Sequence, residues 1–137
     1  MGPVSGYIEV GAWDKGRTNV NYCTRVLAMR KNMKQAADLL QGEEYYDALD
    51  IMGEMENVMS QLDASLYTPL FIPADEGDIT PEQQKYQTQA KGFYSQAIDG
   101  LEKFLSLIPK QALSKSIDNA NKYKYEIQIE RDVSYSE

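Results

Sequence analysis

Histidine is absent from this 137-residue chain, and cysteine occurs only once. Without an imidazole, the chain has no histidine ligand for haem, zinc or a di-iron centre, and no histidine to act as a general acid or base. The single Cys23 excludes an internal disulfide, and it lies on an apolar helix stripe, where an inert buried thiol is expected. These absences remove the commonest metal, haem and acid–base sites.

Long apolar runs are also missing. None reaches the roughly 18 residues that a membrane span needs, and the N-terminus lacks the basic and then apolar pattern of a signal peptide. No serine, cysteine or lysine has a recognisable base partner, and no glycine-rich phosphate loop stands between a strand and a helix. We therefore expect no enzyme, no catalytic residue, no metal site and no cofactor.

Basic residues are scarce where acidic residues gather. The net charge is −7, yet residues 1–41 carry six basic side chains against three acidic ones, and residues 42–82 carry eleven acids and no lysine or arginine. An acidic chain is a poor nucleic-acid binder, because phosphate contacts need a basic face. The basic segment has two interpretations: a docking surface for an acidic partner, or an intramolecular complement to the acidic segment. Its six basic residues are Lys15, Arg17, Arg25, Arg30, Lys31 and Lys34.

Glycine recurs about every five residues over 1–17, interleaved with apolar and aromatic side chains. The pattern fits neither a helix nor a hairpin, so we predict an extended N-terminal arm. A disordered terminus is one interpretation of such an arm. The other is a segment that orders on a partner, with Tyr7 and Trp13 as exposed anchors.

Helical periodicity begins at residue 18. Apolar residues spaced three and four apart predict helices over about 18–40, 43–66, 80–108 and 110–127. Their short or medium connections, with no strand pattern anywhere, predict an all-α, up-down four-helix bundle over residues 18–129, monomeric when free. Residues 130–137 are predicted to be a frayed C-terminal tail.

The third predicted helix has the clearest boundaries. Thr80 is placed to cap it, and Gln83 follows three residues later, which is the capping-box pattern. Pro109 ends the helix, because proline lacks the N–H that would continue it. Gly92 and Gly100 each cost up to about 1 kcal/mol inside a helix. Close approach of a neighbouring helix is therefore the role expected for them.

Methionine is concentrated on the stripes of the first two predicted helices, at positions 29, 33, 52, 55 and 59. We interpret these side chains as ordinary core, and the alternative is a soft pocket for an apolar ligand. The acidic run DEGD at residues 75–78 lacks the spacing of an EF-hand. It is interpreted as a solvated turn.

Three runs of the chain resemble one known family. FYSQAIDGLEKFLSLIP (residues 93–109) is similar to the last core helix of the extrinsic Q-type, or PsbQ-like, subunits of photosystem II, and EMENVMSQLDASL (54–66) looks like the helix that precedes it. RVLAMRKNMK (25–34) is similar in character to the family's first helix. The resemblance covers about residues 18–109, and the departures over 67–73 and 110–137 indicate an algal or diatom relative.

The resemblance implies a non-catalytic role. PsbQ-like subunits bind the lumenal face of photosystem II, stabilise the oxygen-evolving complex and help retain calcium and chloride. A location in the chloroplast thylakoid lumen is also implied, peripheral to the thylakoid membrane, with the photosystem II core and other extrinsic subunits as partners. Two other interpretations remain open: a free-standing helical adaptor for an amphipathic partner helix, and a carrier of an apolar ligand.

Overall fold

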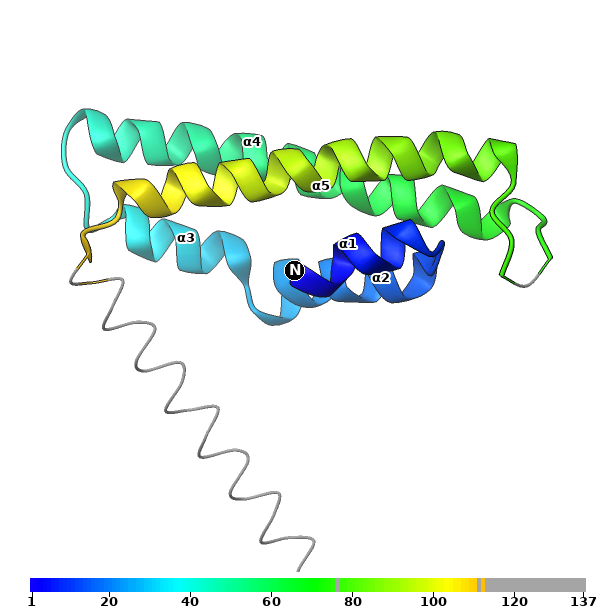
Figure 1. The fold of residues 1–137 in the computed structure, drawn as a ribbon. Coiled ribbons are helices and arrows are strands. Elements are labelled where there is room, and N and C mark those ends of the chain that lie inside the picture. The colour runs from blue at the N-terminus through cyan, green and yellow to red at the C-terminus, as the bar shows by residue number, and fades with distance from the viewer. Residues whose placement is uncertain (76, 111, 113–137) are drawn as a thin grey trace, which may run out of the picture.

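The computed structural model describes residues 1–75, 77–110 and 112, and Figure 1 shows them as helices joined by turns and short loops. No strand occurs among these residues, so the predicted all-α class is confirmed. None of the helices described has the length and apolarity that crossing a membrane requires. In chain order the elements are α1 (Gly2–Glu9), α2 (Trp13–Asn21), the π-helical turn η1 (Tyr22–Val26), α3 (Met29–Ala37), α4 (Glu43–Tyr67), the 3-10 turn η2 (Thr68–Phe71) and α5 (Pro81–Leu107).

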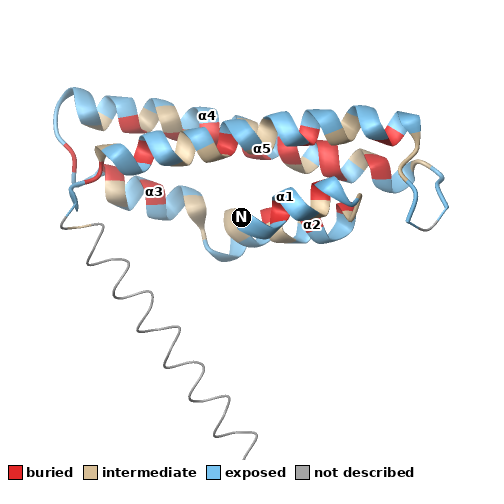
Figure 2. Cartoon of the chain, viewed as in Figure 1, coloured by how far each residue is buried: buried red, intermediate tan, exposed pale blue. Residues whose placement is uncertain are grey.

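α4 and α5 form a long antiparallel hairpin, and among the described helices they share the most extensive contact (Figure 1). α5 contributes the fully buried Ala90 and Ala97 and the buried ring of Phe104. In Figure 2 the buried positions follow the helix faces that meet inside the molecule. The apolar residues buried on α4 recur three and four apart, as predicted, and are Ala48, Met52, Met55, Met59, Leu62 and Leu66.

The two ends of this hairpin follow rules that are visible in the sequence. Gly42, which precedes α4, has a φ of +63°, a conformation that residues with a Cβ disfavour. At the start of α5, the Gln83 N–H donates to Thr80 Oγ1 and the Thr80 N–H donates to Gln83 Oε1, both at 3.1 Å. The predicted capping box is therefore confirmed. The buried Gln83 amide also donates to the carbonyl oxygens of Pro69 and Ile72, at 3.2 and 3.4 Å, which ties η2 to α5.

The N-terminal segment is helical, so the prediction of an extended arm over residues 1–17 is wrong. α1 and the start of α2 occupy it. Val4 and Ile8 lie on one face of α1 and are fully buried. Burying each side chain contributes about 1.5–3 kcal/mol, whereas each helical glycine costs about 1 kcal/mol. Burial therefore outweighs the cost of Gly2 and Gly6.

Polar contacts hold the end of α1 against α5. Gln87 Nε2 donates to the carbonyl oxygens of Ile8, at 2.9 Å, and Glu9, at 3.1 Å. Carbonyl oxygens in the last turn of a helix lack the usual partner four residues on, and the Ile8 oxygen also accepts the Gly11 N–H at 3.3 Å. Lys91 Nζ lies 2.6 Å from Glu9 Oε2. Gly11, with a φ of +72°, then turns the chain into α2.

The first predicted helix is broken, because α2 passes into η1 and Ala28 takes a left-handed conformation with a φ of +48° before α3 begins. Thr24 Oγ1 donates to the Val20 carbonyl oxygen at 3.1 Å, and hydroxyls that bond backbone in this way compete with regular helical pairing. Asn32 Nδ2 donates to the Leu27 carbonyl oxygen at 2.6 Å. The break thus has its own hydrogen bonds in place of those of a continuous helix.

In the described structure α2 and α3 pack on α4, α4 packs on α5, and α1 packs on α2 and α5 (Figure 1). The predicted fourth helix, 110–127, lies outside the described residues except for positions 110 and 112, and the predicted tail, 130–137, lies wholly outside them. The boundary predicted between an arm and a bundle falls inside α2. Residues on both sides of it share one hydrophobic core.

The two glycines of α5 differ in their surroundings. A Cβ at Gly92 would meet no neighbouring atom within 4 Å, whereas a Cβ at Gly100 would collide with Met55 Sδ. The prediction of close helix approach is therefore right for Gly100 and wrong for Gly92.

Alanine at these two positions is expected to have different effects. Gly92→Ala should raise the free energy of unfolding by about 0.5–1 kcal/mol, because alanine is the better helix former and nothing obstructs its methyl group. Gly100→Ala should gain less than this or lose stability, because Met55 has to move. Urea unfolding of both variants measures the difference. Equal gains would contradict the packing of Gly100 against Met55.

Candidate docking face

The six basic residues predicted to form a docking surface all lie on α2, η1 and α3. Five of them are exposed and Arg17 is half-buried. The six residues also differ in whether an acidic side chain of the same molecule pairs with them.

Arg17 is committed to contacts within the molecule. Its Nε lies 2.9 Å from Asp63 Oδ1 on α4, and its guanidinium carbon lies 4.4 Å from the centroid of the Tyr67 ring. The two charged side chains are 33% and 27% exposed, so water and salt screen this pair less than an open surface pair. An acid at position 17 would therefore disturb the fold as well as any docking.

Arg30 and Lys34 also pair within the molecule. Arg30 Nε lies 2.8 Å from Glu56 Oε1 on α4, and both side chains are exposed. Lys34 Nζ donates to Asp38 Oδ1 at 2.6 Å and to the Tyr45 hydroxyl at 2.9 Å. These hydrogen bonds, the one to Asp38 above all, raise the pKa of Lys34 above its ordinary value of 10.5. Lys34 is therefore charged at neutral pH, where it keeps its hydrogen bond to Tyr45 of α4.

Lys15, Arg25 and Lys31 are exposed, and none of them has an ion pair among the residues that the structure describes. They are the basic side chains left for a partner. The intramolecular interpretation thus fits Arg17 and Arg30, each of which pairs with one acidic side chain of α4, and Lys34 is also paired within the molecule. The docking interpretation stays a prediction, and the residues left for it are Lys15, Arg25 and Lys31.

The two aromatic side chains predicted as exposed anchors in the N-terminal segment are buried or half-buried. Trp13 is 6% exposed and belongs to the core, so its expected role as an exposed anchor is wrong. Tyr7 is half-buried, and its Cβ lies close to Gly16 of α2. Both are covered because the segment folds into helices that pack on the rest of the chain.

The break between α2 and α3 leaves three large apolar side chains exposed. Tyr22, Val26 and Leu27 are 50%, 68% and 49% exposed. They surround the exposed Arg25 in sequence, so this corner of the molecule combines apolar surface with positive charge. The available signal for it was the β-branched pair of Thr24 and Val26, because such residues weaken a helix.

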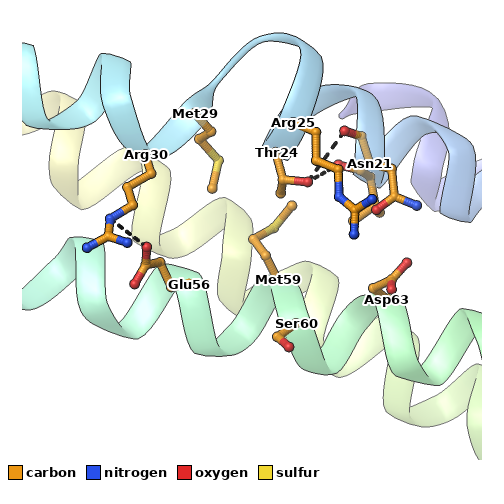
Figure 3. A pocket seen from close by; sticks show the side chains of 10 residues that line it. Asn21, Thr24, Arg25, Met29, Arg30, Glu56, Met59, Ser60 and Asp63 are labelled. Atoms are coloured by element: carbon orange, nitrogen blue, oxygen red, sulfur yellow. Dashed lines mark hydrogen bonds and ion pairs between the residues drawn. The ribbon is translucent and has the colours of Figure 1, made fainter.

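A groove of about 370 Å³ lies between this break and α4 (Figure 3). Arg25 and Arg30 line it from one side, and Glu56 and Asp63 line it from α4. The Arg30–Glu56 pair spans the groove, and Arg25 extends toward α4 on the side of Asp63. Two basic and two acidic side chains therefore face one another across the groove. Because the charges of its lining cancel, the groove favours neither an anionic nor a cationic ligand.

The remaining candidate groups have ordinary surroundings. Cys23 is half-buried in η1, rather than buried as expected. Within the described part of the chain, no three acidic or cysteine side chains come together as a metal site would require. The methionines fit the core interpretation: Met29 packs against the core, and those buried in it are Met33, Met52, Met55 and Met59.

Comparison of the chain with protein-family models, with curated proteins and with solved structures found no match. The resemblance to PsbQ-like subunits is neither supported nor contradicted by this result and stays a prediction.

The two ion pairs that join the basic and acidic segments are expected to differ in strength. In double-mutant cycles with alanine, Arg17 and Asp63 should couple by about 1 kcal/mol, because both are half-buried and the arginine also stacks on Tyr67. Arg30 and Glu56 should couple by less than about 0.5 kcal/mol, because water surrounds both. Urea unfolding of the single and double variants measures the couplings. Equal values would show that burial does not set the strength of these pairs.

Proposed function

We propose that this chain is a non-catalytic, PsbQ-like extrinsic subunit on the lumenal side of photosystem II, where it stabilises the oxygen-evolving complex and its retention of calcium and chloride. The observation that supports the proposal is that two of the sequence runs that resemble the family pack against each other. Residues 54–66 lie on α4, and residues 93–109 lie on α5 and its end. They face each other in the central hairpin, where Met55 packs against Gly100.

The shape and charge of the helices suit a docking role. The α4–α5 hairpin is a long platform, and α2, η1 and α3 lie along it (Figure 1). Lys15, Arg25 and Lys31 can meet an acidic partner without breaking the pairs with α4. Docking of this kind is peripheral to the thylakoid membrane and sensitive to salt. Independently of this role, we propose that the fold is an up-down bundle whose fourth position is completed by a helix that begins near residue 110.

A free-standing helical adaptor is the second candidate. The exposed apolar side chains at the break favour it, because an amphipathic partner helix docks on apolar surface. The precursor sequence separates the two candidates: a bipartite targeting region for plastid and lumen is expected only for the photosystem subunit. A carrier of an apolar ligand has less support, since the methionines belong to the core.

Co-purification tests the assignment to the photosystem. Photosystem II particles from the organism that makes this chain should contain it and should lose it in a high-salt wash. Intact, oxygen-evolving particles that lack the chain would overturn the assignment and leave the adaptor.

Charge reversal tests the docking face. Lys15→Glu with Lys31→Glu should release the chain from its complex at lower salt than the unchanged chain, because exposed charges are screened over about 10 Å at 0.1 M salt. Lys85→Glu with Lys103→Glu, at exposed positions of α5, is the control with the same change in net charge. Urea midpoints of both variants should stay near that of the unchanged chain. Release of both variants at one salt concentration would remove the basic face as the docking surface.

A further inference from the structure

The described helices leave part of one bundle position uncovered. α1 packs on α2 and α5 and runs antiparallel to α5 (Figure 1). Glu9, at the end of α1, pairs with Lys91. Gln87 also bonds carbonyl oxygens there, so the end of α1 lies beside residues 87–91 of α5. Because eight helical residues span about 12 Å, α1 covers this side of α5 no further than about residue 98. Beyond that point α1 is absent, and α5 faces α3.

An apolar groove of about 540 Å³ lies there, between α3 and the last turns of α5. Met33 and Ala36 of α3 and Leu39, just after α3, line one side of it, and Leu101 and Leu105 of α5 line the other. Leu39 is 62% exposed and Leu105 is 44% exposed. Side chains of this kind, gathered on two facing helices, mark a surface on which another element packs.

The chain itself supplies an occupant. Pro109 follows α5, Ala112 already borders the groove, and residues 113–137 come next. Leu113, Ile117 and Ala120 are spaced four and three apart, which is the apolar stripe of a helix. The few residues between α5 and this stripe match the usual length of a connection between antiparallel helices.

We propose that residues 113–120 dock in this groove as a short helix antiparallel to α5. The uncovered side of α5, from residue 99 to residue 108, is about 15 Å long, which accommodates about ten helical residues. Ile127 would then lie beyond the start of α1, outside the groove. α1 and the docked segment thus share the one position that a full-length fourth helix takes in an up-down bundle. This inference does not depend on the proposed function.

Disulfide formation within the full chain tests the inference. In a Cys23→Ser background, Ala36→Cys with Ile117→Cys joins a groove position to the docking stripe. Lys34→Cys with Ile117→Cys is the control, because Lys34 lies two residues away and reaches Tyr45 of α4 instead of the groove. Under mild oxidation the first pair should form a disulfide within the monomer about tenfold faster than the control or more, since a disulfide needs its two Cα atoms within about 7 Å.

Each other outcome has a definite meaning. Equal rates for the two pairs would overturn the inference, because an undocked segment reaches both thiols alike. A disulfide formed only between two chains, at twice the mass, would overturn it too and assign the groove to a second copy. Ile127→Cys with Ala36→Cys should react no faster than the control, and a fast reaction would contradict the limit set by α1. If Ala36→Cys fails to fold, the exposed Gln35, which also borders the groove, replaces it.

Discussion

The close contact between α4 and α5 is the constraint on which the other elements depend. Ala90, Ala97 and Gly100 keep the α5 side of this contact narrow, so the two backbones can approach. The α4 side carries methionines, whose flexible side chains fill an irregular seam without a precise shape. Each helix then has a second face to cover: α2 and α3 pack on α4, and α1 packs on α5. The short N-terminal helices are stable because the hairpin gives their few apolar residues a place to be buried.

Two glutamines, one turn apart on α5, connect this hairpin to segments distant in sequence. Gln83 bonds carbonyl oxygens of η2 and the residue after it, and Gln87 bonds carbonyl oxygens at the end of α1. The oxygens of Pro69 and Ile8 also accept the backbone N–H groups of Ile72 and Gly11, at 3.1 and 3.3 Å, so the side-chain amides of α5 give them a second hydrogen bond. These bonds hold η2 and the end of α1 against α5.

Local patterns predicted the elements whose cause is local. α4 and α5 have long apolar stripes, and α5 has a capping box formed by neighbouring residues, so their type and limits could be derived from the sequence. The failures lie where tertiary burial or a side-chain hydrogen bond decides. α1 forms because Val4 and Ile8 are buried against distant parts of the chain. No feature of the neighbouring sequence predicts that burial. The candidate site divides in the same way: the basic residues are visible in the sequence, but the partner of Arg17 lies 46 residues away and depends on the fold.

The basic side chains of this molecule differ according to whether α4 supplies an acidic partner. Arg17 and Arg30 turn toward α4, and the planar guanidinium suits a fixed pair with a carboxylate. Lys15 and Lys31 stay in water, as strongly hydrated ammonium groups prefer. Salt screens exposed charges strongly and half-buried pairs much less. A docking contact made by the exposed lysines can therefore be broken by salt that leaves the Arg17–Asp63 pair, and the apolar seam beneath it, in place. For this reason a reversible electrostatic attachment is compatible with a stable fold, although both draw on the same basic segment.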